Sequence, residues 1–292
     1  MMSSNVVMPE LTPELGWPSY QLSKVERWKS NIRSVQQDYI AEEVPISLVY
    51  NGTPHVVMLS TPTNLEDFAL GFSITEGIIE TASELQSIHV YNRSNGIEVR
   101  MEIPKSRFSH LSGKGRNLTG RTGCGLCGAS TLQQAIRHPK PVQGELNLPA
   151  AELISALTAI NHHQQLNQLT GAVHAAAWVV PGQGVQYVRE DVGRHNALDK
   201  LIGLLLRIGK NPAAGFVVIT SRASYELVQK AASVGITLLA AMSAPTGLAI
   251  RLADEAGLTL VGFVRDNQHV VYTHPERLNH TTYPTLIKSS NS

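Results

Sequence analysis

Both cysteines of the chain lie in one short stretch, Arg121-Thr122-Gly123-Cys124-Gly125-Leu126-Cys127-Gly128. Glycine flanks each thiol, so the backbone around both has unusual conformational freedom. A Cys-x-x-Cys pair can bind a metal ion, run dithiol–disulfide exchange or carry a sulfur atom as a persulfide. We therefore expect this stretch to do chemistry, and the surrounding sequence must discriminate among these three uses.

Metal binding and thioredoxin-like exchange both fit the stretch poorly. Structural zinc takes four ligands, and a second Cys-x-x-Cys pair is missing. A deaminase-type zinc needs H-x-E upstream of P-C-x-x-C, whereas Gly123 precedes Cys124 and the H-x-E at His274 lies downstream. A redox pair normally opens a helix after a strand, where the helix dipole lowers the thiol pKa. We expect no strand before Cys124 and no metal ligands here.

Sulfur carriage fits the stretch better. Lys114, Arg116 and Arg121 are close in sequence to the thiols and would favour the thiolate, which is the reactive form. The alternative for these basic residues is ordinary solvated loop charge. Two inert thiols are a further alternative, but inert cysteines usually lie in apolar surroundings, and this stretch is polar and rich in glycine.

The composition excludes several broad classes of protein. The formal net charge of +1 gives no global argument for binding nucleic acid or a membrane. Two cysteines are too few for a disulfide scaffold and fit a reducing compartment. The N-terminus lacks the pattern of a signal peptide, and no apolar run is long enough to span a bilayer. We therefore expect a soluble cytoplasmic protein.

The residue pattern divides the chain into four segments. Residues 1–40 contain three prolines and mostly polar side chains, which predicts a loose N-terminal arm. Residues 41–104 hold two Asn-Gly hairpin signals and one helical pattern, which predicts a small α+β domain. Residues 105–130 are rich in Gly, Ser and basic side chains, which predicts a mobile loop that carries the cysteines.

Residues 131–280 alternate between helical and strand patterns, which predicts an α/β domain. Its strands GFVVITS, TLLAAMSA and LTLVGFVR are almost continuously apolar, as is typical of a buried and mostly parallel sheet. Ligands of such sheets bind beyond the carboxyl ends of the strands. Those ends are residues 220–222, 243–246 and 265–267.

Two polar stretches next to predicted helices allow two interpretations each. The stretch from Arg189 to Asn196 could supply a helix cap, or His195 could contact a nucleotide or metal cofactor at a helix N-terminus. Ser221 and Arg222 could bind phosphate at the next helix start, or Ser221 could simply cap that helix. A P-loop and a G-x-G-x-x-G motif are both missing, which disfavours nucleotide triphosphatases and Rossmann dehydrogenases.

Several long motifs follow one another between about Glu42 and Arg277: EVPISLVYNGTPHVVMLSTP, LEDFALGFSITEGII, RTGCGLCG, EDVGRHNALDKLIG and TGLAIRLADEAGLTLVGFVR. Together and in this order they resemble the formate dehydrogenase accessory sulfurtransferase (FdhD/NarQ) family. The resemblance implies a homodimeric persulfide carrier with a cytidine deaminase-like core. Such a carrier takes sulfur from a cysteine desulfurase and passes it to the molybdenum bis(guanine dinucleotide) cofactor that formate dehydrogenase requires. A cofactor-binding chaperone without sulfur chemistry is the alternative.

The resemblance also assigns roles to residues. The persulfide-bearing cysteine of the family falls on Cys124, and its partner falls on Cys127. The cofactor-binding segment of the family falls on Phe263, Val264, Arg265, Asp266, Asn267 and Gln268. Family members often have glycine and a second basic residue where this chain has Asp266 and Gln268. We expect the guanine dinucleotide ends of the cofactor, or GDP or GMP as a mimic, to dock near Ser221, Ser243, Arg265 and His195.

Overall fold

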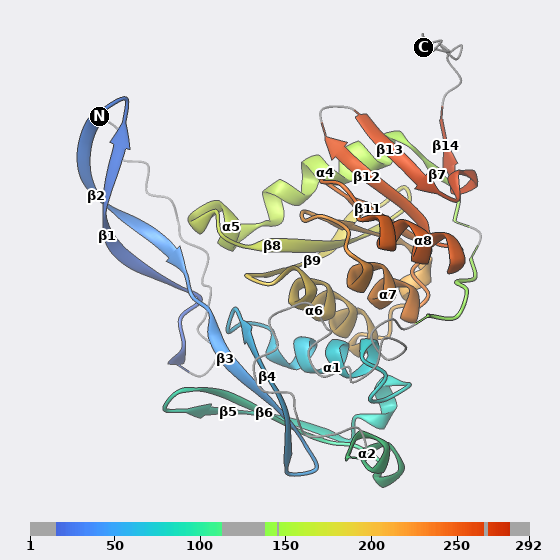
Figure 1. The fold of residues 1–292 in the computed structure, drawn as a ribbon, viewed down its shortest axis with the longest axis horizontal. Helices are drawn as coiled ribbons and strands as arrows, with labels where there is room; N and C mark the ends of the chain where they lie inside the picture. Colours follow the sequence, from blue (N-terminus) through green and yellow to red (C-terminus); the bar gives the residue numbers. More distant parts are fainter. Residues whose placement is uncertain (1–15, 113–137, 145, 266–267, 281–292) are drawn as a thin grey trace.

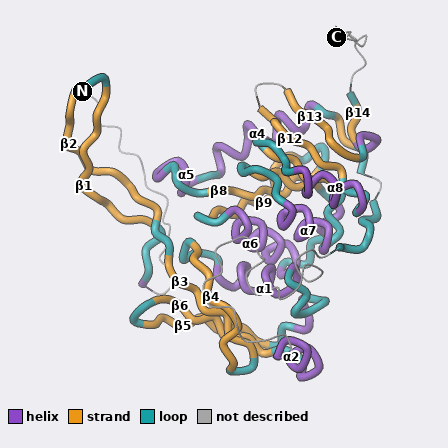
Figure 2. The backbone as a smooth tube through the Cα atoms, viewed as in Figure 1, coloured by secondary structure: helices purple, strands orange, loops and turns teal. Residues whose placement is uncertain are grey.

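The computed structural model describes residues 16–112, 138–144, 146–265 and 268–280 (Figure 1). The fold is a mixed α/β arrangement, as predicted. A six-stranded sheet with helices on both faces forms the larger part, and a four-stranded sheet with one covering helix forms the smaller part. A two-stranded hairpin projects from the junction of the two parts, as the tube in Figure 2 also shows. Cys124 and Cys127 lie outside the described residues.

The projecting hairpin consists of β1 (Tyr20–Lys29) and β2 (Ile32–Ala41). Its turn residues Ser30 and Asn31 both have positive φ angles, 47° and 66°, as a two-residue hairpin turn requires. The expectation of a loose arm over residues 1–40 is therefore wrong from residue 20 onward. The prolines that suggested it all precede β1, while the strand residues themselves alternate only weakly between polar and apolar.

The smaller sheet contains β3 (Val44–Tyr50), β4 (Thr53–Ser60), β5 (Ser87–Arg93) and β6 (Gly96–Glu102) in the order β4-β3-β6-β5. Both predicted hairpins are present: the first turns at Asn51-Gly52, and the second turns at Ser94-Asn95, with Gly96 as the first residue of β6. Helix α1 (Leu65–Thr75) packs on one face, and the short helices η2 (Ala82–Glu84) and α2 (Lys105–Ser112) flank it.

The larger sheet has the order β13-β12-β11-β10-β8-β9. Its strands are β8 (His174–Val180), β9 (Gly184–Asp191), β10 (Phe216–Ile219), β11 (Leu238–Ala241), β12 (Thr259–Arg265) and β13 (Gln268–Thr273). Of the neighbouring pairs, only β10–β11 and β11–β12 are parallel, and the other three are antiparallel, so the expectation of a mostly parallel sheet is wrong. Only three residues separate β8 from β9 and only two separate β12 from β13, and connections this short allow only antiparallel pairing.

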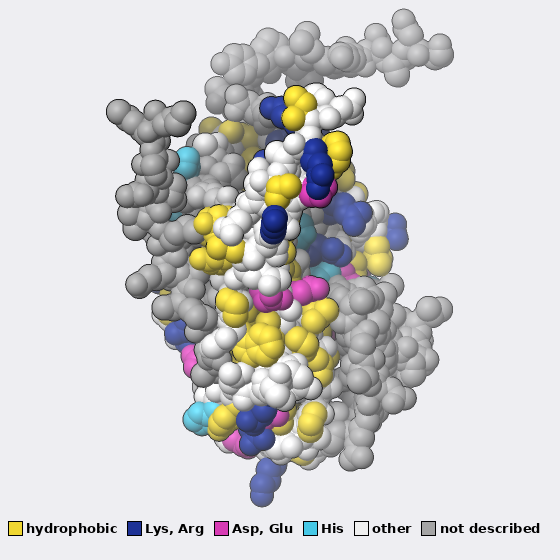
Figure 3. All heavy atoms as spheres, turned by 90° about the vertical axis from the view of Figure 1, so that its left-hand side faces the viewer, with side chains coloured by type: hydrophobic (Ala, Val, Ile, Leu, Met, Phe, Trp, Pro, Cys, Tyr) yellow, Lys and Arg dark blue, Asp and Glu magenta, His cyan; other side chains and the backbone are white. Residues whose placement is uncertain are grey.

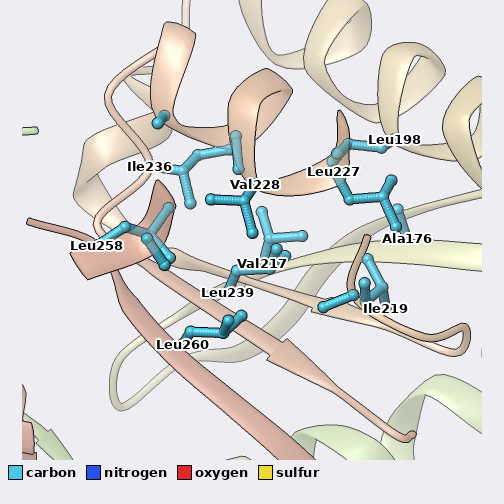
Figure 4. Close-up of a cluster of buried hydrophobic side chains, with 14 of the residues drawn as sticks. Ala176, Leu198, Val217, Ile219, Leu227, Val228, Ile236, Leu239, Leu258 and Leu260 are labelled. Atoms are coloured by element: carbon cyan, nitrogen blue, oxygen red, sulfur yellow. The ribbon is translucent and has the colours of Figure 1, made fainter. Parts of the chain in front are cut away.

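Helices cover both faces of the larger sheet. Helices α6 (Arg194–Arg207), α7 (Tyr225–Ser233) and α8 (Gly247–Glu255) pack on one face, where Val217, Leu239 and Leu260 meet Leu227 and Val228 (Figure 4). Helix α4 (Ala151–His163) covers the other face, and α5 (Gln165–Thr170) follows it. Burial of both faces explains why these strands are almost continuously apolar.

The remaining elements are short. Strands β7 (Leu148–Pro149) and β14 (Leu278–Asn279) pair with each other, and η3 (Pro212–Ala214) and η4 (Pro275–Arg277) are single turns. None of the helices in the described part of the chain combines the length and the apolar character that a membrane span requires.

Candidate functional site

One edge of the larger sheet gathers the polar residues that the sequence analysis selected. The carboxyl ends of β10, β11 and β12 meet there because these strands are parallel. Helices α7 and α8 begin at this edge, and α6 begins there too because β9 runs in the same direction as β10. The backbone N–H groups at three helix N-termini therefore face one region, which favours anions.

Backbone contacts hold the loops of this edge together. Ala223 and Pro245 form an isolated parallel bridge, and the Thr246 N–H donates to the Ala223 carbonyl at 3.0 Å. The Phe263 N–H donates to the Ser243 carbonyl at 3.3 Å. The loops after β10 and β11 and the last residues of β12 are thus joined across the edge, so Ser243 and Phe263 lie side by side.

His195 joins the start of α6 to the start of α7. It is buried, with 6% of its surface exposed, and its Nε2 lies 3.2 Å from Glu226 Oε2 and 3.3 Å from Ser224 Oγ. Ser224 Oγ also donates to Glu226 Oε2 at 3.0 Å. Burial alone would raise the pKa of Glu226. The hydrogen bond and charge of His195, together with the hydrogen bond from Ser224, outweigh burial, so the pKa of Glu226 lies below its ordinary value. Glu226 is therefore a carboxylate, and it lies within hydrogen-bond distance of both Ser224 Oγ and His195 Nε2.

Positive charge without a carboxylate partner collects along this edge. Among the described residues, Arg194, Arg222 and Arg265 form no ion pair, and the buried Nε of Arg194 has no hydrogen-bond partner. His174, at the start of β8, lies near Arg194. Burial, followed by the charges of Arg194 and His195, lowers the pKa of His174, so its imidazole is neutral at pH 7. An anion at this edge would find guanidinium groups that are not already neutralised.

The chain takes a strained course where β12 ends. Phe263 has a φ angle of 53°, which is unusual for a side chain of this size, and the pairing of β12 with β13 is irregular between Gly262 and Arg265. The guanidinium carbon of Arg265 lies 5.6 Å from the centre of the Phe263 ring. An exposed guanidinium and a half-buried ring are thus presented together next to Ser243.

The other predicted site residues are less well placed for contact with a ligand, or cannot be assessed. The Val264 side chain is completely buried in the cluster that faces α4. Gln268 is exposed and, as the first residue of β13, pairs with Arg265 of β12. Asp266 and Asn267 lie outside the described residues. Ser221 is buried and its Oγ donates to the Arg222 carbonyl at 3.1 Å, so it does not cap α7, whose N-cap is Ser224.

Asp191 belongs to the stretch from Arg189 to Asn196 that could supply a helix cap, and its role is broader than that. Its Oδ1 accepts from the Gly193 N–H at 2.7 Å, while its Oδ2 lies 2.7 Å from Lys200 Nζ. Oδ2 also accepts from Ser60 Oγ at 2.5 Å and from the Thr61 N–H at 3.0 Å. Both charged groups are completely buried. The carboxylate therefore ties the larger sheet to the smaller one and is not available to a ligand.

Sequence reasoning missed the partners of these residues. Glu226 and Ser224 were not selected, although Ser-x-Glu at a helix start is a visible signal for a carboxylate near the N-terminus. The buried Lys200 was also missed, because a lysine within an amphipathic helix pattern normally reaches solvent. Within the described ranges, no group of three or more His, Cys, Asp or Glu residues is arranged to hold a metal ion.

Comparison with known proteins shows strong similarity over nearly the whole chain. The model of the FdhD/NarQ family matches residues 41–279. A sulfur carrier protein FdhD from Cupriavidus necator is 49% identical over 279 residues, which cover 96% of this chain and 97% of the relative. A sulfur carrier protein FdhD from Bordetella bronchiseptica is 46% identical over 269 residues, which cover 91% of this chain and 98% of the relative.

A solved structure shares the fold. It is a crystal structure described as a formate dehydrogenase accessory protein from Desulfotalea psychrophila, with a TM-score of 0.70 and 25% sequence identity. The match covers 90% of this chain and 100% of the chain in that crystal structure. The arrangement of the two sheets is therefore common to both proteins.

Proposed function

The chain belongs to the FdhD/NarQ family, and on that premise we propose that it is a sulfur carrier that serves formate dehydrogenase. Cys124 accepts sulfur from a cysteine desulfurase and holds it as a persulfide. The acceptor is the molybdenum bis(guanine dinucleotide) cofactor, bound as a substrate. The observation that carries this proposal is the similarity to sulfur carrier proteins over more than nine-tenths of the chain, together with a single Cys-x-x-Cys pair.

The loading step needs only thiol exchange. The Cys124 thiolate attacks the outer sulfur of the desulfurase persulfide, a new S–S bond forms on Cys124, and the desulfurase cysteine leaves as a thiolate. No net oxidation or reduction occurs in this step. Because the thiolate is the attacking species, the basic residues around the cysteines favour the reaction, and a reducing cytoplasm keeps both thiols free. These steps make the chain a sulfurtransferase with a covalent intermediate.

The sheet edge supports a binding site for the phosphate-bearing ends of the cofactor. Arg194, Arg222 and Arg265 have no carboxylate partner among the described residues, and three helices begin at this edge. Phosphate oxygens accept hydrogen bonds from guanidinium and backbone N–H groups alike. The ring of Phe263 with Arg265 above it offers a flat surface next to Ser243, which suits a guanine base. GDP is the corresponding test ligand.

Persulfide formation tests the sulfur-carrier function directly. The full-length protein is incubated with a cysteine desulfurase and cysteine, and its intact mass is measured for the wild type, Cys124→Ala and Cys127→Ala. We expect a mass gain of one or more sulfur atoms in the wild type and its loss in Cys124→Ala. A wild-type protein that gains no sulfur while still binding GDP would instead support the cofactor-binding chaperone, in which both cysteines are dispensable.

GDP binding tests the cofactor site separately. Arg265→Ala removes an unpaired guanidinium from the edge, so we expect GDP affinity to fall by roughly tenfold, because a charge-assisted hydrogen bond contributes on the order of 1.5–3 kcal/mol. Lys210→Ala is the matched control, since it removes one positive charge just beyond the opposite end of α6. Equal GDP affinity in wild type and Arg265→Ala would refute this location of the site.

A further inference from the structure

His174 is the first residue of β8 and lies at the sheet edge that carries the proposed cofactor site. Strand β8 runs antiparallel to β10, so it begins where β10 ends, and the Thr220 N–H donates to the Ala175 carbonyl at 3.1 Å. His174 also pairs with Asp191, the last residue of β9. Strand β8 begins on the left-hand side of Figure 1, which faces the viewer in Figure 3, and basic and histidine side chains lie close together there beside the hairpin.

The His174 side chain faces the start of α6. Alternate residues of a strand point to the same face, and Ala176 and Trp178 of β8 belong to the core cluster that α6, α7 and α8 cover. The imidazole is half-buried, and among the described residues it forms no hydrogen bond and no ion pair. The buried Nε of the neighbouring Arg194 has no hydrogen-bond partner there either. Two nitrogen-bearing groups without partners therefore lie close together at this edge.

The charges that surround His174 keep its imidazole neutral at pH 7. Burial lowers the pKa of His174 most, the charges of Arg194 and His195 lower it further, and the carboxylate of Asp191 acts in the opposite direction. The field of Asp191 is largely cancelled, because Lys200 Nζ lies 2.7 Å from its carboxylate and both groups are completely buried. Positive charge therefore prevails at the imidazole, and a bound proton is unfavourable.

The other segments at this edge offer His174 no further carboxylate within the described part of the chain. Residues 165–173, which precede β8, include no charged side chain, and the first charged residue after β10 is Arg222. Glu226, at the start of α7, is already engaged by His195 and Ser224. A negative charge that favours a proton on His174 must therefore come from a bound anion.

We propose that His174 binds a phosphate group of the guanine dinucleotide cofactor as an imidazolium, and that it takes up one proton from solvent as the phosphate enters. Both ring nitrogens of an imidazolium are donors, and a hydrogen bond from a charged donor to phosphate is stronger than one from a neutral donor. The phosphate also offsets the positive field of Arg194, which otherwise opposes protonation. This inference rests on the cofactor site proposed above and adds that binding there tightens as the pH falls.

GDP affinity measured by calorimetry at pH 6 and pH 8 tests this role in the wild type and in His174→Gln, whose amide cannot take up a proton. The terminal phosphate of GDP titrates in the same range, but it does so equally for both proteins, so the ratio of their affinities is the measure. We expect the wild type to bind GDP about tenfold more tightly than His174→Gln at pH 6 and within about twofold of it at pH 8. His89→Gln, exposed on β5 of the smaller sheet, is the matched control and should bind as the wild type does at both pH values.

NMR of the histidine Cε1 atoms follows the proton in the wild type itself. The signal that disappears in His174→Gln, or in His174→Asn if the first variant does not fold, identifies His174. We expect its titration to move to higher pH when the protein is saturated with GDP. An affinity ratio that is equal at pH 6 and pH 8, or a His174 titration that GDP leaves unchanged, would overturn this inference and leave the cofactor site standing. A wild type that binds no GDP at either pH would refute the cofactor site and this inference with it.

Discussion

Replacing Gly203 by alanine should destabilise the protein strongly, although alanine is the better helix former. Gly203 of α6 lies against α1, and a Cβ atom at this position would come within 1.8 Å of the Asp67 carbonyl oxygen and 2.9 Å of the Gly71 nitrogen. A Cβ at Gly71 would come within 1.8 Å of the Asp199 carbonyl oxygen. The two helix backbones therefore touch at a pair of glycines, and a methyl group at either one must push the helices apart.

The expected loss can be estimated from two opposing terms. Alanine stabilises a helix interior by about 1 kcal/mol relative to glycine. Overpacking of a close-packed contact costs about 1–3 kcal/mol, and occasionally more. The upper part of that range applies because the atoms in the way belong to backbone and cannot change rotamer. We expect a net loss of about 2 kcal/mol in the free energy of unfolding.

Urea unfolding of the full chain, followed by circular dichroism, measures this loss. Gly247→Ala is the matched control: Gly247 also lies in a helix, and the nearest atom to its Cβ position is Arg251 Nη1 at 3.6 Å, the end of a flexible side chain. We expect Gly247→Ala to be neutral or slightly stabilising. A Gly203→Ala protein as stable as the wild type would show that α1 and α6 do not cross at backbone contact.

Three further predictions follow from the polar contacts. The pKa of the Glu226 carboxyl is lowered in the folded state, so this group stabilises the fold above its unfolded pKa of about 4.3. That stabilisation is lost as the pH falls through the folded pKa. The difference in unfolding free energy between the wild type and Glu226→Gln should therefore shrink when unfolding is measured at progressively lower pH. Lys200→Met leaves the Asp191 carboxylate buried without its cation and should cost about 3–5 kcal/mol in urea unfolding; a loss below about 1 kcal/mol would contradict the buried pair. Arg222→Ala should weaken GDP binding and flatten its salt dependence in calorimetric titrations at two ionic strengths, whereas parallel salt curves would exclude Arg222 from the site.

The sequence predicted elements well where local signals agree with the tertiary fold. The turn at Asn51-Gly52 needs positive φ at both residues, and Asn-Gly indicates that from sequence alone. The ends of β10, β11 and β12 were likewise predicted, because long apolar runs end in polar residues there. The positions of these ends in the sequence therefore predict that Ser221, Ser243 and Arg265 lie at one sheet edge, and the structure has them there.

Contacts between distant parts of the chain could not be predicted in this way. The glycines at positions 71 and 203 look like weak points of two helices, and only the packed structure reveals them as the contact between α1 and α6. The β1–β2 hairpin was missed because its side chains alternate weakly, which follows from exposure on both faces. His195 was selected for its place before a helix, but its link to Glu226 depends on how α6 and α7 pack.

Buried ion pairs explain how the two sheets keep one relative position. Asp67 of α1 binds two arginines of the larger part, Asp191 binds Lys200, and Asp199 binds Lys230, which also reaches Glu76 beside α1. Burial lowers the pKa of Lys230, but the carboxylates of Asp199 and Glu76 outweigh it and raise the pKa, so the lysine stays charged. Such pairs add less stability than apolar packing would, yet misplacing one leaves a buried charge without a partner. If α6 slid by one turn, several of these ion pairs would break at once. The ion pairs therefore fix α6 against the smaller sheet, and they also fix the position of His195 at the start of α6.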